Sequence, residues 1–253
     1  MQPQRQKSKI SPKSPTLSLT SQTNSPNPQN PKDLFRKQCK IRLEHLATFP
    51  NTISKDSKLQ KILLSLLKTQ IPKNPRKKPF RILLYLPLGI EFDCRKVLKI
   101  LKKQKNIEIF TPFMCDVSFK MVKYRFPLQK KQFGVLESPN SLREIKTIHL
   151  AIVPVIGIDN QFKRIGFGKG MYDRFFETLK NKPKIVFVCR EFFYHSLEIT
   201  NPYDISGNYF ITPFALLLRK GKYNDNLDSR KFRLISLNCR RRKLPYFTQI
   251  FTR

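Results

Sequence analysis

The chain has 253 residues, with 50 Lys and Arg against 17 Asp and Glu, and a formal net charge of +33. Its length and its hydrophobic fraction of 40% suffice for one buried core, but no apolar run approaches the roughly 20 residues that a membrane-spanning helix needs. Five widely spaced cysteines exclude a disulfide framework and a paired zinc site, so we expect a reducing cytoplasm.

The first 32 residues differ in composition from the middle of the chain. They contain no Asp or Glu and are rich in Ser, Pro, Asn, Gln and Lys. Such a segment buries too little apolar surface to offset the entropy of ordering, so we predict a disordered basic tail over residues 1–32. A transit peptide is also Ser-rich and acid-poor, but the prolines disfavour the amphipathic helix that it needs. A second basic extension is predicted at 220–253, on either side of a single domain at 33–219.

Helix and strand patterns alternate within that domain. Aliphatic residues recur at helical spacing between Leu59 and Leu67, and again between Val97 and Leu101, where Asp93 is a candidate cap. Short apolar runs predict strands at 82–86, 107–110, 149–158, 185–189 and 209–211. This alternation predicts an α/β fold with three layers, in which helices cover both faces of a mostly parallel sheet. Ligands of such sheets bind beyond the carboxyl ends of the strands.

A glycine-rich loop follows the predicted strand at 149–158. The sequence from Arg164 to Phe176 reads RIGFGKGMYDRFF, and an apolar helical face begins within it at Met171. Alternate glycines allow positive φ angles and bring several N–H groups to one anion. Because the loop joins a strand to a helix start, it is typical of a phosphate site.

Two better-known phosphate loops do not fit this sequence. Walker A needs Ser or Thr after its lysine, whereas Lys169 precedes Gly170, and the Rossmann pattern needs a third glycine where Met171 stands. An ordinary glycine-rich turn remains the alternative interpretation.

The loop and its surroundings resemble the 5-formyltetrahydrofolate cyclo-ligase family, also called methenyltetrahydrofolate synthetase. That family carries Arg-Leu-Gly-x-Gly-x-Gly-Tyr-Tyr-Asp after a strand ending in Pro-Gly-x-x-Phe-Asp, and segments 153–159 and 164–173 reproduce this layout. Weaker matches lie at 82–93, 120–122 and 134–137, and the resemblance covers about residues 34–219.

Three residues depart from the family pattern. Met171 replaces the first of two tyrosines, Asn208 stands where a second aspartate is expected four residues after Asp204, and Pro213 replaces a common acid. These changes bear on metal geometry and turnover more than on the fold. Two alternatives therefore stay open: a degenerate member that binds folate or nucleotide, and a basic RNA-associated protein, favoured by the charge and by the cluster at 240–243.

The resemblance implies ATP-dependent cyclisation of 5-formyltetrahydrofolate to 5,10-methenyltetrahydrofolate, with release of ADP and phosphate. The formyl oxygen is phosphorylated and N10 then attacks the activated carbon. It further implies a magnesium-dependent ligase of one-carbon metabolism. We expect a cytoplasmic monomer with no membrane contact, for which nucleic acid is only a nonspecific partner.

The family also implies roles for individual residues. Arg164, Lys169 and Tyr172 are the predicted catalytic residues. The predicted ATP contacts are Arg36, Lys37, Lys40, Arg164, Gly166, Phe167, Gly168, Lys169, Gly170, Met171, Tyr172 and Asp173. The predicted folate contacts are Leu86, Glu91 and Phe133, and the predicted magnesium ligands are Asp173 and Asn208. Without the resemblance, Leu86 and Phe133 are interpreted as core, and Glu91 and Asp173 as acids at helix starts.

Overall fold

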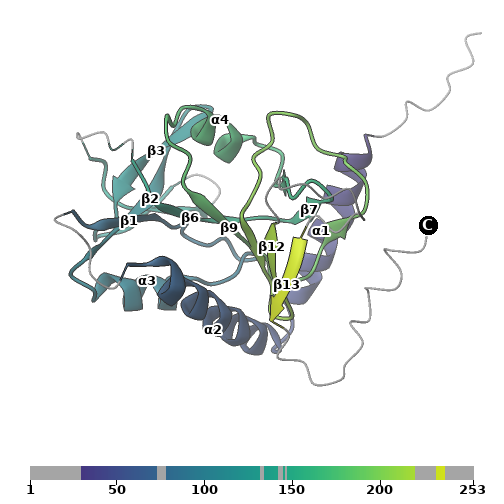
Figure 1. The fold of residues 1–253 in the computed structure, drawn as a ribbon, viewed down its shortest axis with the longest axis horizontal. Helices are drawn as coiled ribbons and strands as arrows, with labels where there is room; N and C mark the ends of the chain where they lie inside the picture. The colour runs from purple at the N-terminus through teal and green to yellow at the C-terminus, as the bar shows by residue number, and fades with distance from the viewer. Residues whose placement is uncertain are drawn as a thin grey trace, which may run out of the picture.

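The computed structural model describes residues 30–72, 78–131, 134–141, 145, 147–219 and 232–236. An 8-stranded sheet with the order β13-β12-β11-β9-β6-β1-β2-β3 forms its centre (Figure 1). These strands are β1 (Phe80–Leu83), β2 (Ile107–Cys115), β3 (Ser118–Lys123), β6 (Leu150–Pro154), β9 (Lys184–Val188), β11 (Tyr209–Ile211), β12 (Leu216–Arg219) and β13 (Phe232–Ser236). Two small sheets contain β7 (Gly157–Asp159), β8 (Arg164–Ile165) and β10 (Tyr194–His195), and β4 (Gln129–Lys130) with β5 (Leu136–Glu137).

The centre of the large sheet is parallel. Strands β2, β1, β6, β9 and β11 pair in parallel, while β3, β12 and β13 add antiparallel edges. Strands β1, β6, β9 and β11 are mostly apolar because both of their faces are covered. The predicted α/β fold with a mostly parallel sheet is confirmed.

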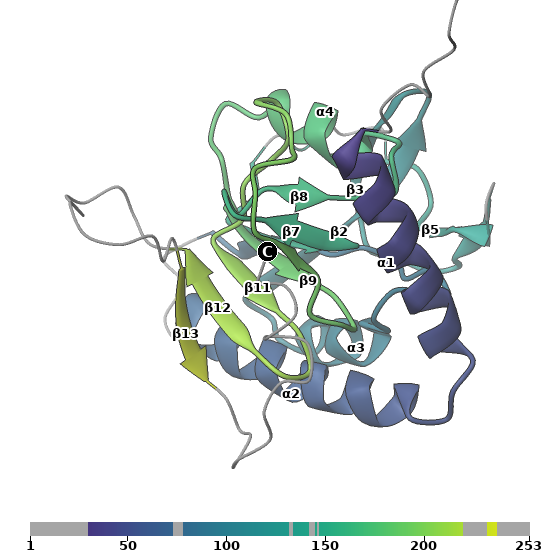
Figure 2. The same cartoon turned by 90° about the vertical axis from the view of Figure 1, so that its right-hand side faces the viewer.

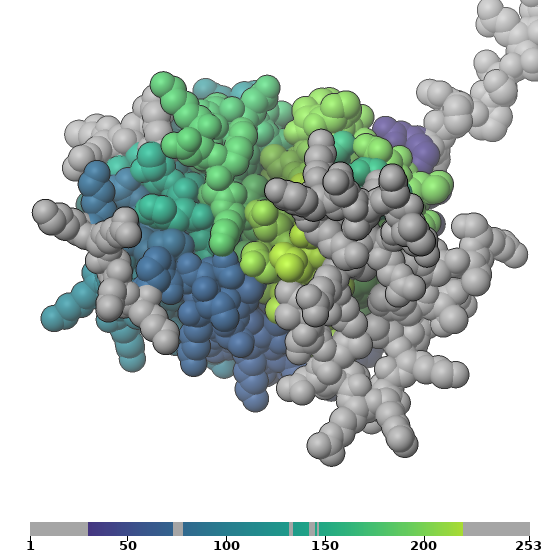
Figure 3. Space-filling view, viewed as in Figure 1, coloured from purple at the N-terminus to yellow at the C-terminus, as the bar shows by residue number. Residues whose placement is uncertain are grey.

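Helices cover both faces of this sheet. Helices α2 (Thr52–Gln70) and α3 (Arg95–Lys102) lie on one side, and α4 (Met171–Glu177) lies on the other with α1 (Pro31–Ala47) and β7 (Figures 1 and 2). Successive strand residues point to opposite faces, so Ile152 packs with α2 and α3 whereas Val153 packs with α1 and α4. The space-filling view shows the α2–α3 surface in blue, opposite the green surface around α4 (Figure 3).

Helices α2 and α3 arise from the predicted periodicities. Leu59, Leu63 and Leu67 are fully or almost fully buried at four-residue intervals, and the buried side of α3 is equally aliphatic. The cap of α3 needs a correction, because the N-cap residue is Cys94 and not Asp93. Asp93 still stabilises the helix start, since its carboxylate accepts a hydrogen bond from Arg95 N at 3.0 Å.

Other predicted boundaries also shift. The run at 149–158 forms two strands, because the chain leaves the large sheet after Pro154 and enters the three-stranded sheet at Gly157. Strand β1 ends at Leu83, before the predicted limit at Leu86.

The predicted domain limits change at both ends. Helix α1 starts at Pro31, inside the predicted tail, and Asn30 caps it by accepting from Lys32 N at 3.0 Å. Strand β13 adds residues 232–236 of the predicted C-terminal extension to the sheet. Residues 1–29 and the basic cluster at 240–243 lie outside the described residues. In the part of the chain that the structure describes, no helix is long and apolar enough to cross a membrane.

Candidate functional site

The glycine loop joins β8 to α4, as predicted. Gly168 and Gly170 adopt φ angles of +95° and +61°, a region that side chains with a Cβ rarely enter. Gly166 is needed for a different reason, because a Cβ at this position would overlap the Arg164 guanidinium. The loop therefore bends at two glycines and lets a charged group lie directly against its backbone at the third.

Arg164 is the central cation of this site although it is only 6% exposed. Its Nε donates to Pro154 O at 3.3 Å, and one terminal nitrogen lies 3.4 Å from Asp173 Oδ2. Its guanidinium carbon also lies 4.9 Å from the centre of the Tyr172 ring, within the range of a cation–π contact. Asp173 is held in turn by Ile205 N, which donates to its Oδ1 at 3.1 Å.

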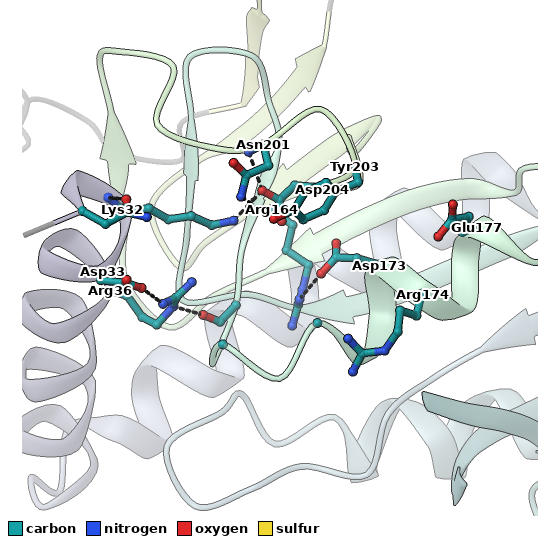
Figure 4. Close-up of a pocket in the computed structure, with 14 residues that line it drawn as sticks. Lys32, Asp33, Arg36, Arg164, Asp173, Arg174, Glu177, Asn201, Tyr203 and Asp204 are labelled. Carbon is teal, nitrogen blue, oxygen red and sulfur yellow. Dashed lines mark hydrogen bonds and ion pairs between the residues drawn. The ribbon is translucent and has the colours of Figure 1, made fainter. Parts of the chain in front are cut away.

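A cleft of about 510 Å³ opens beside the loop (Figure 4). Side chains from α1, from α4 and from the segment 201–204 surround it, and Arg164 points into it (Figure 4). Its lining residues are Asn30, Lys32, Asp33, Arg36, Arg164, Gly166, Gly168, Gly170, Asp173, Arg174, Glu177, Asn201, Tyr203 and Asp204. The cleft is thus polar and carries charges of both signs.

The first turns of α1 close one side of the cleft. Arg36 Nε donates to Gly166 O at 2.8 Å, which ties the helix to the glycine loop. One turn earlier, the buried Lys32 forms an ion pair with Asp204, whose carboxylate also accepts from Asn201 N at 2.6 Å. Lys32 and Arg36 are four residues apart, so they lie on the same face of α1.

Glu91 lies half-buried in the segment between β1 and α3, where its charge and that of Arg164 affect each other's surroundings. Its carboxylate accepts a hydrogen bond from Leu88 N at 2.9 Å. Burial raises the pKa of Glu91 to about 7, although the Leu88 amide and the charges of Arg164 and Arg190 act in the opposite direction. Burial also raises the pKa of Tyr172, and the charge of Glu91 adds to that increase.

The structure sorts the predicted ATP contacts into three groups. Six of them line the cleft: Arg36, Arg164, Gly166, Gly168, Gly170 and Asp173. Phe167, Met171 and Tyr172 pack against the apolar core of the α1–α4 side. Lys37, Lys40 and Lys169 are exposed, and Lys40 pairs with Glu44 at 3.7 Å.

The other predicted contacts are more dispersed. Leu86 is buried in the core of the α2–α3 side, and Phe133 lies outside the described residues. Asn208 is exposed, and its side-chain oxygen accepts from Ile185 N at 2.8 Å, which joins the start of β11 to the start of β9. Asp204, four residues earlier, lines the cleft instead.

Several cleft residues were missed by the sequence predictions. Lys32 fell within the predicted tail, although its spacing of four residues from Arg36 is a usable signal. Asp204 matches the first of the two family aspartates, although only the second position, Asn208, was predicted as a ligand. Nothing in the local sequence marks Asn201, Tyr203 or Glu177 as cleft residues.

The carboxylates of this site fit a magnesium ion bound together with phosphates. Within the described ranges, no group of three or more His, Cys, Asp or Glu residues is arranged to hold a metal ion. Magnesium commonly uses only one or two protein carboxylates and completes its shell with water and phosphate oxygens. Asp173, beside the glycine loop, meets that requirement.

Comparisons with known proteins agree with this architecture. The family model described as the 5-formyltetrahydrofolate cyclo-ligase family matches residues 30–192. The fold is similar to that of the Aquifex aeolicus 5,10-methenyltetrahydrofolate synthetase, with 22% identity, a TM-score of 0.58, and coverage of 78% of this chain and 96% of that one. A 5,10-methenyltetrahydrofolate synthetase from Mycoplasma pneumoniae is also similar, with 22% identity, a TM-score of 0.51, and coverage of 72% and 98%. No curated protein sequence matches the chain significantly.

Proposed function

Because the chain belongs to the 5-formyltetrahydrofolate cyclo-ligase family, we propose that it converts 5-formyltetrahydrofolate and ATP to 5,10-methenyltetrahydrofolate, ADP and phosphate. One observation carries this proposal. Arg164 lies in the wall of a polar cleft, pairs with Asp173 beside the glycine loop, and its charge lowers the pKa of the half-buried Glu91, so one cation acts on both the phosphate-type loop and an acid outside it. Transfer of a phosphoryl group between two bound substrates requires this kind of alignment and charge neutralisation.

ATP is proposed to bind in the cleft, with its phosphates at the glycine loop. The backbone at Gly166, Gly168 and Gly170 approaches the phosphates, and Arg36 and Arg164 supply charge from either side. Lys169, at the exposed tip, adds a cation to the γ-phosphoryl group. Lys37 and Lys40 lie on the exposed side of α1, so we propose for them only attraction of the nucleotide towards the cleft.

Phe167, Met171 and Tyr172 have supporting roles in this proposal. Their side chains pack against the core and keep the loop in place, and their main chain contributes to the ATP site. Met171 fills the place of the family tyrosine as an apolar packing group. Because the loop keeps this packing with methionine in place of the tyrosine, the Met171 substitution is by itself no argument for the degenerate member.

Magnesium, when bound, supplies positive charge to the phosphates. We propose Asp173 as its protein ligand, directly or through water. Asn208 is a weaker candidate, because it is not among the residues that line the cleft at the glycine loop, is uncharged, and accepts from Ile185 N. Asp204 is held by Lys32 and Asn201 and keeps the 201–204 segment against α1.

Glu91 is the proposed folate contact. With a pKa of about 7, its carboxyl group is available in both protonation states near neutral pH, so it can accept from or donate to polar atoms of the folate around N10. The proposed stacking of Leu86 and Phe133 on the pterin stays a prediction.

A turnover assay with a lysine variant tests the proposal. Purified protein with 5-formyltetrahydrofolate, Mg²⁺ and ATP is expected to show the ultraviolet absorbance of the methenyl product only when ATP is present. For Lys169→Ala we expect kcat/KM for ATP to fall by about 100-fold, because a cation facing the transferred group is lost, with an unchanged melting temperature. Lys180→Ala, which removes an exposed cation just after α4, is the control and should keep full activity.

The outcome also decides between the open alternatives. No product from folded wild-type protein that still binds folate would favour the degenerate member. No product and no folate binding would favour the RNA-associated protein.

A further inference from the structure

Arg190 forms an ion pair that no sequence motif predicted. It follows β9, and its side chain is only 7% exposed. Its Nε and one terminal nitrogen each donate at 2.8 Å to a different carboxylate oxygen of Asp56, near the start of α2. This two-point pairing fixes the guanidinium plane, which a single contact does not.

The pair holds both ends of the segment that carries Glu91. The remaining terminal nitrogen of Arg190 donates to Gly89 O at 2.7 Å, and Asp56 Oδ2 accepts from Asp93 N at 3.3 Å. Gly89 and Asp93 lie two residues before and two residues after Glu91. The chain on both sides of the proposed folate contact is therefore anchored to one largely buried ion pair.

Arg190 also affects Glu91 through its charge. Burial raises the pKa of Glu91, and the positive charge of Arg190 is one of the causes that limit the increase. The other charged or titratable groups that interact with Glu91 are Arg164 from β8, Tyr172 from α4, Tyr85 from the chain after β1, and Cys94 at the start of α3. Arg164 and Arg190 supply the only cations in that set.

A neighbouring ion pair provides a natural comparison. Lys55 Nζ lies 2.9 Å from Glu191 Oε2, so it joins the same two segments one residue away from each partner of the Arg190–Asp56 pair. Among the described residues, the Lys55 ammonium donates a hydrogen bond to Glu191 and none to the segment around Glu91. The two pairs differ in their contact with that segment, while both connect α2 to the chain after β9.

We propose that Arg190 and Asp56 are positioning residues for folate, because together they fix the Gly89–Asp93 segment and hence the Glu91 carboxyl group. This inference rests on the proposed function, since it needs Glu91 to contact the folate. A catalytic group displaced by about 1 Å can cost about 100-fold in rate, so an anchor on both sides of Glu91 has a clear use.

Kinetics of Arg190→Ala and Lys55→Ala test the proposal on the full chain. For Arg190→Ala we expect the KM for 5-formyltetrahydrofolate to rise by about tenfold or more while the KM for ATP stays within about twofold. The acid limb of the pH profile of kcat/KM should move to higher pH, because Glu91 loses a nearby cation. Arg190→Lys should restore the pH profile but only part of the folate KM, since lysine keeps the charge and loses the two-point contact.

Hydrogen exchange gives a second readout that needs no turnover. Amide exchange in segment 88–93 should be faster in Arg190→Ala than in Lys55→Ala. If Arg190→Ala fails to fold, Asp56→Asn replaces it, because it removes the charge and keeps the size of the side chain. An inactive wild-type protein would contradict the proposed function, and the exchange rates would still decide whether the anchor exists. A folate KM and exchange rates equal to those of Lys55→Ala would overturn the inference.

Discussion

The two helical layers on the sheet bury different kinds of side chain. On the α2–α3 side, every buried residue of the two helices is aliphatic. On the α1–α4 side, the buried groups include Lys32, Arg164, Asp159 and Asp204. Burying charge costs free energy even when the charges are paired, whereas burying leucine stabilises the fold. The difference indicates that the apolar faces of α2 and α3 mainly supply stability, apart from the Asp56–Arg190 pair near the start of α2, while the α1–α4 side holds most of the buried charge at some cost to stability.

The first prediction tests the stabilising role of the α2–α3 layer and has the largest expected effect. Leu63 is fully buried, so Leu63→Ala should lower the free energy of unfolding by about 2–5 kcal/mol. Turnover per folded molecule should stay unchanged, because Leu63 packs on the face opposite the cleft. Urea denaturation and the cyclo-ligase assay measure the two quantities. A loss of turnover at full stability would contradict the division between the layers.

The second prediction concerns the stability cost of the site. The pKa of Glu91 is about 7 in the folded protein and near its ordinary value of 4.5 when unfolded. The folded state therefore binds more protons between these values, and the free energy of unfolding decreases as the pH rises from 4.5 to 7. Glu91→Gln removes this dependence, so it should stabilise the protein by up to about 3 kcal/mol at pH 8 and very little at pH 4. It should also weaken folate binding.

Glu108 is a matched control with the opposite sign. Its side chain pairs with Arg81 and Lys123, and although partial burial acts to raise its pKa, the hydrogen bonds and charges of these two cations together lower it. Its ion pairs stabilise the folded state above the ordinary pKa and are lost in acid, so Glu108→Gln should reduce stability at pH 8. Urea denaturation of both variants at several pH values compares the two signs. If both variants changed the free energy of unfolding by the same amount and in the same direction, burial would not destabilise the charged form of Glu91.

The sequence predicts the two layers unequally well for a physical reason. Helices α2 and α3 follow from aliphatic periodicity, and the turns of the loop follow from its alternate glycines, because both signals are local. The contacts that complete the site are not local. Lys32 and Asp204 are 172 residues apart, and Arg190 and Asp56 are 134 apart.

Side-chain partners explain the remaining differences. Asn208 was predicted as a metal ligand from its alignment, and only the structure places its oxygen on the amide of Ile185. The break between β6 and β7 could not be predicted from the sequence either, because both strands are buried and form one mostly apolar run. A pattern of hydrophobicity reports burial, and it does not report which sheet a strand joins.

Gly166→Ala has the smallest expected effect on stability. It tests whether turnover can be reduced while the free energy of unfolding stays the same. The added Cβ would overlap the end of the Arg164 side chain, which can move, so the guanidinium should shift away from Asp173 while the backbone stays in place. We expect kcat/KM for ATP to fall about tenfold and the unfolding free energy to change by less than about 1 kcal/mol.

The double variant with Arg164→Ala provides the decisive control. If Gly166→Ala acts through Arg164, then alanine at position 166 should cost nothing further once the arginine is absent. Additive losses would mean instead that the added methyl group disturbs the ATP site independently of Arg164.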